Sequence, residues 1–264
     1  MRTNLVKNAK EVNTISKAKV NVSSEGNHDM VIAFDTTGSM SSYIDAVKKH
    51  VKELIPELLK TNPNMKIGIV AFGDYCDMES ATVFGDAYQV LDLTDDENKI
   101  IKFISKAKNT GGGDGDEFYE LVIKKITEET SWRKDSVKSV LLIADCAPHP
   151  VGYSFGAFVT NAQIDWRTEA KKSAALGIKW DTLSINSRYS DWYKELSSLT
   201  NGVHAPFKTD TKTNDLIRAA AYSRGGAATM DSFRGCAKAI VNDSELAATY
   251  AAYSKELVNI NIKK

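Results

Sequence analysis

Short apolar runs alternate along the chain with segments in which apolar residues recur at helical spacing. The run 30–34 is unbroken, which is typical of a strand buried on both faces of a parallel sheet, and two further runs predict buried strands: 66–72 and 139–144. Three more strands are predicted, the first with the pattern of an edge strand: 88–93, 178–185 and 203–205. Helices are predicted between the strands from apolar positions at helical spacing: 44–59, 100–104, 118–126, 161–176, 190–199 and 212–223.

This alternation predicts an α/β fold, with a doubly wound, mostly parallel sheet of six strands and helices on both faces. In such a sheet, ligands bind at the carboxyl ends of the strands, where the strand order reverses. The polar loops that follow the strands at 30–34 and 139–144 are therefore candidates for a binding site. Inside the helix predicted at 44–59, Pro56 is expected to kink or end the helix.

The two ends of the chain depart from this alternation. Residues 1–28 are polar and rich in Lys, Asn and Ser, which predicts an N-terminal tail. The alternating part, 29–224, is expected to form one domain. The alternation lapses in 225–264, where one helix is predicted at 244–257, so this segment is expected to be a C-terminal helical extension.

Composition narrows the function classes. The charges of the 34 basic and 34 acidic residues cancel, so we do not expect sequence-independent binding to nucleic acid or to an anionic membrane. An apolar leader and an apolar run of ~18 residues are both missing from the sequence, which predicts a protein that stays in the cytoplasm. The three cysteines are far apart and include no Cys-x-x-Cys pair, which favours reduced thiols and does not predict zinc.

Oxygen-bearing side chains gather in three of the loops. Asp35, Thr37 and Ser39 follow the first buried strand, and Asp145 ends another. The glycine loop (residues 109–117) adds four more oxygen donors: Thr110, Asp114, Asp116 and Glu117. Oxygen ligands of this kind suit a hard cation such as Mg²⁺. The carboxyl ends of parallel strands meet at one edge, so the sequence predicts that these loops form one metal site.

Four segments, in this order, resemble von Willebrand factor type A domains: the Asp-Thr-Thr-Gly-Ser turn (35–39), the Ile-Gly-Ile-Val-Ala-Phe-Gly-Asp-Tyr stretch (67–75), the Thr-Gly-Gly-Gly-Asp-Gly-Asp-Glu loop (110–117) and Leu-Leu-Ile-Ala-Asp-Cys-Ala-Pro-His (141–149). The resemblance covers about residues 29–224. It implies a Rossmann-like fold with one antiparallel edge strand. It also implies a metal-ion-dependent adhesion site, in which an acidic side chain of a protein partner completes the coordination of Mg²⁺ or Mn²⁺.

Carried over residue by residue, the resemblance assigns the metal to Asp35, Thr37, Ser39 and Asp145, with Thr37 in place of the usual serine. Many family members have a threonine just after the glycines, where this chain has Asp114. Asp114 is therefore the preferred ligand from the glycine loop, and Thr110 is the second choice. An aspartate here predicts a more anionic site that depends less on a partner's carboxylate. The backbone nearest the partner is expected at three glycines: Gly38, Gly112 and Gly113.

Two other functions compete with metal-dependent binding. The turn at 35–39 also resembles that of aspartyl-phosphate enzymes, which makes Asp35 a candidate nucleophile in a phosphotransferase or hydrolase. In the second alternative, the domain is a structural module that binds no metal, and the predicted metal site is only a remnant. No catalytic dyad stands out in the sequence, and we therefore do not predict an enzyme.

Three further groups receive ordinary structural interpretations. Cys146 is expected to be a buried thiol and His149 a surface residue outside the site. The acidic cluster Asp74, Asp77 and Glu79 offers oxygen ligands for Ca²⁺ but lacks the twelve-residue ligand pattern, so these residues are expected to be solvated.

Overall fold

The computed structural model describes residues 26–79, 87–156, 159–210, 212–239 and 243–262. In this part of the chain a six-stranded sheet has the order β3-β2-β1-β4-β5-β6, and β3 alone is antiparallel to its neighbour. The strands are β1 (Asn27–Asp35), β2 (Met65–Phe72), β3 (Tyr88–Thr94), β4 (Ser136–Ala144), β5 (Ile178–Ser184) and β6 (His204–Pro206). The predicted fold is confirmed, including its antiparallel edge strand.

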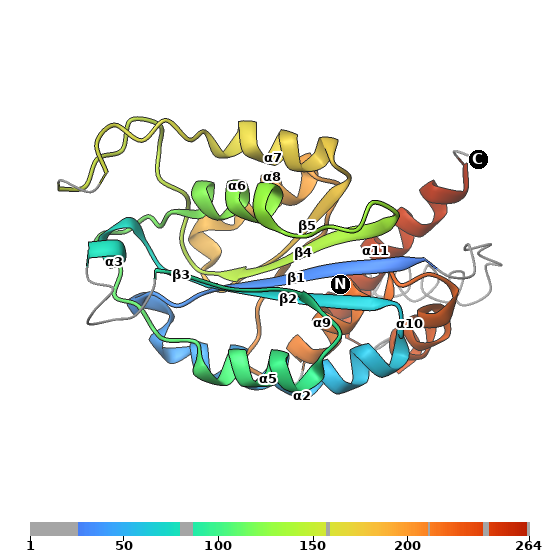
Figure 1. Cartoon of the computed structure of the whole chain (residues 1–264). Helices are drawn as coiled ribbons and strands as arrows, with labels where there is room; N and C mark the ends of the chain where they lie inside the picture. The colour runs from blue at the N-terminus through green and yellow to red at the C-terminus, as the bar shows by residue number, and fades with distance from the viewer. Residues whose placement is uncertain (1–25, 80–86, 157–158, 211, 240–242, 263–264) are drawn as a thin grey trace.

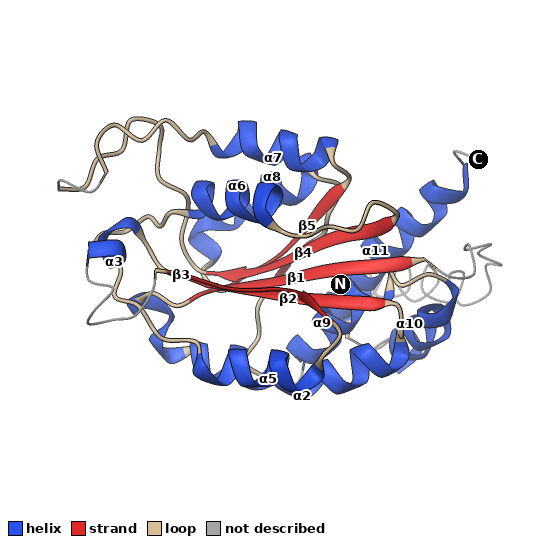
Figure 2. Cartoon of the chain, viewed as in Figure 1, coloured by secondary structure: helices blue, strands red, loops and turns tan. Residues whose placement is uncertain are grey.

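Helices cover both faces of the sheet (Figures 1 and 2). One face is covered by α6 (Tyr119–Glu129), α7 (Trp166–Ala175) and α8 (Ser190–Leu199). The other is covered by α2 (Ile44–Thr61), α5 (Glu97–Lys106), α9 (Lys212–Tyr222), α10 (Ala227–Ala239) and α11 (Ser244–Ile262). Short helical turns occupy three loops: η1 (Gly38–Ser42), α3 (Tyr75–Glu79) and η2 (Ser187–Tyr189).

The central strand β1 is apolar from Met30 to Phe34, where both of its faces are buried. Met30, Ile32 and Phe34 belong to the core on the α2 side, while Val31 and Ala33 belong to the core on the α6 side. This division follows from the two-residue period of a strand. Because β1 pairs with both β2 and β4, the loops after β1 and β4 lead to opposite sides of the sheet. That reversal of strand order places their polar residues at one edge.

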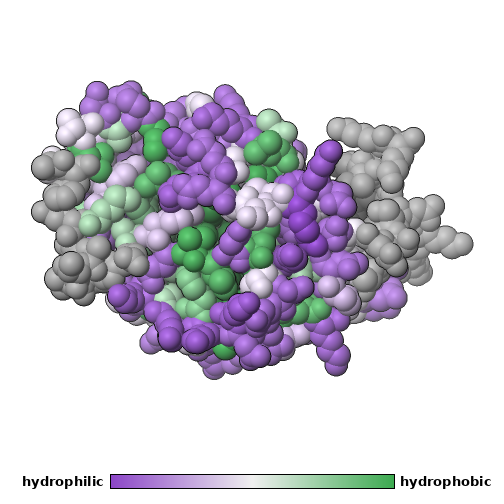
Figure 3. Space-filling view, viewed as in Figure 1, coloured by the Kyte–Doolittle hydropathy of each residue, from purple (hydrophilic) through white to green (hydrophobic). Residues whose placement is uncertain are grey.

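The edge strand β3 is only partly covered. Hydrophobic residues gather across the middle of the face shown in Figure 3, between hydrophilic helices above and below. Val90 of β3 is 54% exposed, and the depression next to it is also lined by Lys125 and Glu129. Charged side chains beside an exposed edge oppose pairing with another strand.

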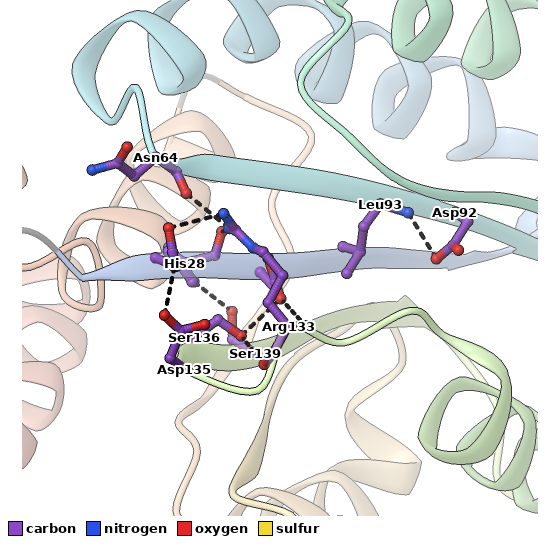
Figure 4. A network of polar contacts seen from close by, with 10 residues as sticks. His28, Asn64, Asp92, Leu93, Arg133, Asp135, Ser136 and Ser139 are labelled. Carbon is purple, nitrogen blue, oxygen red and sulfur yellow. Dashed lines mark hydrogen bonds and ion pairs between the residues drawn. The ribbon is translucent and has the colours of Figure 1, made fainter.

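Arg133 ties together the ends of three strands at the edge opposite the predicted site (Figure 4). Its side chain donates to Asp29 Oδ1 at 2.7 Å, to the His28 carbonyl at 3.1 Å and to the Asn64 carbonyl at 2.8 Å. Beside it, the buried His28 ring contacts Ser139 Oγ at 2.8 Å. This network fixes the start of β1 between β2 and β4.

Pro56 does not end its helix, so of the two expected effects the ending is wrong, and a kink stays a prediction. The helix α2 continues to Thr61 with Pro56 inside it. Proline removes one intrahelical hydrogen bond. The residues around it, Leu54, Ile55 and Leu58, are all buried, and this packing on the sheet offsets the lost bond.

The C-terminal segment contains more helix than its pattern predicts. The helix α11 extends past 257, and α10 was not predicted because its many small residues give a weak apolar stripe. Both helices pack on the core of the domain: Phe233 stacks on Tyr250 with ring centroids 5.0 Å apart, and the Tyr250 hydroxyl donates to the Asp215 carbonyl at 3.0 Å. No helix in the described part of the chain is long and apolar enough to cross a membrane. The N-terminal tail, apart from its last residues, lies outside the described residues.

Candidate metal centre

Three loops meet at the carboxyl edge of β1 and β4. Asp35 is the last residue of β1, and Asp145 directly follows β4, its parallel neighbour. The glycine loop docks on the β1 loop through two backbone hydrogen bonds, from the Gly38 amide to the Gly111 carbonyl at 3.0 Å and from the Thr110 amide to the Thr36 carbonyl at 2.9 Å. Sequence positions more than 70 residues apart are thus held side by side.

Four of the predicted ligands form one run of hydrogen bonds, which we call the polar chain (Asp35, Thr37, Ser39 and Asp145). Asp35 Oδ1 accepts from both the amide and the hydroxyl of Thr37, each at 2.7 Å. The Thr37 hydroxyl lies 3.3 Å from Ser39 Oγ, which donates to Asp145 Oδ1 at 3.1 Å. Asp35, Thr37 and Asp145 are buried, whereas Ser39 is exposed. The polar chain therefore opens to solvent at Ser39.

Tyr119 holds the two aspartate strands together from α6. Its hydroxyl donates to Asp35 Oδ2 at 2.5 Å and accepts from the Cys146 amide at 3.2 Å. The sequence gives no signal for this role, because a tyrosine at helical spacing is indistinguishable from ordinary core. Cys146 itself is a buried thiol, as predicted, and burial together with Asp145 raises its pKa.

The two predicted ligands of the glycine loop lie in different surroundings. Thr110 is buried, with its hydroxyl 3.0 Å from that of Thr36. Asp114 is exposed, and its side chain accepts from the Tyr153 hydroxyl at 2.8 Å and from the Asp116 amide at 3.3 Å. The structure thus places Thr110 against the turn that carries the polar chain, whereas Asp114 contacts Tyr153 and Asp116 instead.

The glycines of this region are fixed by close packing. Gly112 has a φ of +70°, and a Cβ there would lie 3.1 Å from Glu117 Oε1 and 3.4 Å from Thr37 Cβ. A Cβ at Gly38 would lie 2.8 Å from the Gly111 carbonyl, and one at Gly113 would lie 2.9 Å from Cys76 Sγ. Side chains at these positions would push the loops apart. The role predicted for the three glycines in partner binding stays a prediction.

Asp77 shapes the glycine loop from α3. Its carboxylate accepts from the Gly111 amide at 2.7 Å, the Gly112 amide at 3.2 Å and the Asp74 amide at 2.8 Å. It is 2% exposed, and Asp74 is fully buried, so the prediction that these residues are solvated is wrong. Backbone N–H groups take the place of water around the Asp77 carboxylate.

Glu117 is a further carboxylate next to the polar chain. The sequence counts it among the oxygen donors of the glycine loop but does not assign it to the metal. It is 2% exposed, and its Oε2 is buried without a hydrogen-bond partner. Burial, and then the charge of Asp35, raise the pKa of Glu117, and burial likewise raises the pKa of Asp35.

This donor set fits a hard divalent cation. Buried carboxylates that repel one another are stabilised by a positive ion, and an orphaned carboxylate oxygen is a free ligand position. Hydroxyl and carboxylate oxygens are the ligands that Mg²⁺ prefers.

Comparisons with known proteins give one similar sequence and two similar solved structures. A protein of Acanthamoeba polyphaga mimivirus, described as an ariadne-like RING finger protein, is 27% identical over 124 residues, which are 46% of this chain and 11% of the viral protein. The pilus adhesin SpaC of Lactobacillus rhamnosus GG superposes with a TM-score of 0.54 at 13% identity, covering 76% of this chain and 31% of the adhesin. The chain thus spans less than a third of either protein.

A smaller protein matches along nearly its whole length. The conserved hypothetical protein BatB of Bacteroides thetaiotaomicron superposes with a TM-score of 0.51 at 14% identity, covering 79% of this chain and 98% of BatB. At such identities the two solved structures establish the fold alone. The profile of the von Willebrand factor type A domain matches residues 29–221, and the chain therefore belongs to the von Willebrand factor type A domain family.

Proposed function

We propose that this chain is a protein-binding module that depends on a divalent metal and engages an acidic residue of its partner. The observation that carries the proposal is the polar chain, which joins two strand ends by hydrogen bonds between oxygen donors. Mg²⁺ or Mn²⁺ would be held by these four residues, with Thr110 and Glu117 supplying oxygens from the glycine loop. When bound, the metal supplies a positive centre to which a carboxylate of another protein coordinates.

The exposed side of the site supports contact with a partner. Ser39 is exposed, and so are two of the three glycines, Gly38 and Gly113. A partner approaching here meets little side-chain bulk. One structural neighbour is by description a pilus adhesin, which is consistent with a binding role.

The geometry of Asp35 does not favour the aspartyl-phosphate alternative. Asp35 is fully buried, and both of its oxygens accept hydrogen bonds, from Thr37 and Tyr119. A nucleophilic oxygen must reach the phosphorus atom that it attacks. The hydrogen bonds to Thr37 and Tyr119 already occupy both carboxylate oxygens of Asp35. We therefore propose binding rather than catalysis. The three free cysteines support a reducing compartment such as the cytoplasm.

The proposal is tested by calorimetric titration of Mg²⁺ and Mn²⁺ into the full chain and into Ser39→Ala. Ser39 is exposed, so its loss removes a metal ligand without emptying the core. Ser41→Ala is the matched control, because Ser41 is exposed on the same turn η1. We expect saturable binding in the wild type and in Ser41→Ala, and at least tenfold weaker binding in Ser39→Ala. Absence of binding in all three proteins would favour the metal-free structural module.

The carboxylate requirement is tested with the metal-loaded chain on two surfaces. One surface carries a peptide with a central glutamate, and the other carries the same peptide with glutamine. Retention on the glutamate surface that EDTA abolishes supports the proposal. Equal retention on both surfaces would exclude coordination of a partner's carboxylate.

A further inference from the structure

A second set of metal-ligating side chains lies beside the glycine loop, outside the polar chain. We call it the Asp–Asp–His group (Asp74, Asp114 and His149). One ligand atom of each residue lies within 4.8 Å of the other two. Asp74 follows β2, Asp114 belongs to the glycine loop, and His149 follows β4. The sequence predicts His149 at the surface, which is wrong, because it is 2% exposed.

Two of the three donors are buried, and one of them is incompletely paired. Asp74 is fully buried, and its Oδ1 lies 2.7 Å from His149 Nε2. Its other oxygen, Oδ2, is buried without a hydrogen-bond partner. An orphaned oxygen on a buried carboxylate is costly unless something positive meets it. The group therefore includes a buried carboxylate oxygen that can bind a cation, and two of its three residues are not surface groups.

Tyr153 sets the orientation of the other two donors. Its ring stacks on the His149 imidazole with centroids 3.6 Å apart and planes inclined by 17°. Its hydroxyl donates to Asp114 Oδ2 at 2.8 Å, which turns that exposed carboxylate toward the histidine. Metal ligands are commonly held in place by such neighbours. Tyr153 is thus a positioning residue for both.

We propose that Asp74, Asp114 and His149 form a second metal site, which binds a divalent transition metal and best fits Zn²⁺. An imidazole with two carboxylates is a zinc-type donor set, whereas Mg²⁺ prefers oxygen alone. Donors about 2.0–2.1 Å from one ion lie ~3 Å apart or slightly more, so His149 Nε2 and Asp74 Oδ1 need to open only slightly. The sequence contains no local zinc motif because the three donors come from three separate loops.

The site is accessible to ions from solvent. Asp114 is exposed, and His149 lines an open depression on the surface together with Asp116, Pro148 and Trp166. Three protein ligands leave one tetrahedral position for water or for a partner. The glycine loop takes part in both sites, through Glu117 beside the polar chain and through Asp114 here.

The competing interpretation is a plain buried ion pair between Asp74 and His149. Such a pair explains the 2.7 Å contact. It does not explain why Tyr153 directs a second carboxylate to the same imidazole or why Asp74 Oδ2 lacks a partner. The two interpretations differ in one measurable respect, because only a metal site binds zinc through Asp114.

The test is calorimetric titration of Zn²⁺ into the full chain with excess Mg²⁺ present, comparing Asp114→Asn with Asp95→Asn. Asp114 is exposed, so its replacement leaves folding intact, and Asp95, an exposed aspartate in the loop after β3, is the matched control. We expect one zinc ion per chain in the wild type and in Asp95→Asn, and at least tenfold weaker binding in Asp114→Asn. His149→Gln should lose binding as well.

Two results would overturn the second site: no zinc binding at micromolar concentration, or equal affinity in Asp114→Asn and the wild type. Co²⁺ in place of Zn²⁺ identifies the donors, and a thiolate charge-transfer band would assign the metal to a cysteine instead. Ser39→Ala should bind zinc normally. Failure of this proposal is therefore separable from failure of the proposed Mg²⁺ site.

Discussion

The Tyr119 hydroxyl lies 2.5 Å from Asp35 Oδ2 and joins helix α6 to the end of the central strand. The same hydroxyl accepts from the Cys146 amide, next to Asp145. One phenol thus sets the spacing between the two aspartates assigned to the metal. Burial, followed by the charge of Asp35, raises the pKa of Tyr119, so the hydroxyl keeps the proton it donates.

Tyr119→Phe is expected to weaken both folding and metal binding. The change leaves one buried oxygen of Asp35 and one buried amide of Cys146 without their partner, which costs about 1–3 kcal/mol for each such group. Urea denaturation should show a lower free energy of unfolding, and calorimetry a weaker affinity for Mg²⁺. The control is Tyr222→Phe, which removes the hydroxyl bond to Glu57 on the other side of the sheet. If both variants lowered Mg²⁺ affinity equally, Tyr119 would have no specific role at the metal.

The sequence predicts the position of Asp35 and Asp145 for a simple reason. Each ends an unbroken apolar run, and parallel strands that start at one edge also end at one edge. The third loop is harder, because Thr110, Asp114 and Glu117 lie within eight residues of one another. Which of them turns inward depends on backbone angles such as the φ of +70° at Gly112, and residue spacing does not encode these.

The burial of Asp74, Asp77 and His149 shows a second limit of prediction from the sequence. Their positions depend on contacts across long stretches of chain: Asp74 meets His149 75 residues away, and Asp77 meets the Gly111 amide 34 residues away. A polar residue in a loop is usually solvated, so each is assigned to the surface when considered alone. Only the fold shows that one loop supplies the partners of another.

Gly112→Ala should destabilise the glycine loop, and Gly115→Ala should not. A side chain at the positive φ of Gly112 costs about 1–2 kcal/mol, and its Cβ also crowds Glu117 Oε1. At Gly115 a Cβ meets nothing within 4 Å. We expect a lower free energy of unfolding and weaker Mg²⁺ binding in Gly112→Ala only. Equal effects of the two substitutions would mean that the loop lacks the close packing described above.

Asp77→Asn is also expected to destabilise the glycine loop. The amide keeps one acceptor oxygen, but its NH₂ group then faces backbone N–H donors that the carboxylate satisfied. Each unsatisfied buried group costs about 1–3 kcal/mol. Hydrogen exchange of the Gly111 and Gly112 amides should become faster, whereas Asp116→Asn should leave it unchanged. Unchanged exchange in Asp77→Asn would show that Asp77 does not hold the loop.

Folding stability should fall in acid because of His28. Burial, and then the charge of Arg224, lower the pKa of its ring to about 3, with Arg133 acting in the same direction and Asp29 in the opposite one. Below pH 6.5 the His28 ring binds a proton in the unfolded chain but not in the folded chain. The free energy of unfolding therefore decreases as the pH falls from 6.5 toward 3.

The size of this effect is read from the difference between the wild type and His28→Gln, which keeps a hydrogen-bonding group near Ser139. Between pH 7.5 and 5 the wild type should lose about 2 kcal/mol relative to the variant. Urea denaturation at both pH values measures this difference, and the other titrating groups cancel in it. A constant difference would mean that His28 is protonated in the folded chain.

The sequence predicts a boundary at residue 225 between the domain and its C-terminal extension. Substitution of Tyr250, which lies in the extension, tests whether the two parts unfold together. Its side chain is fully buried, stacks on Phe233 and bonds to the Asp215 carbonyl on α9. Tyr250→Ala should therefore lower the free energy of unfolding by about 3–5 kcal/mol, the cost of emptying a large core position. Leu176→Ala, at a side chain that is 56% exposed, should cost far less. A single cooperative transition in urea for Tyr250→Ala, shifted to lower concentration, would show that sheet and extension fold as one unit; a separate early transition would mean that the extension unfolds alone and that residues 29–224 are a domain in their own right.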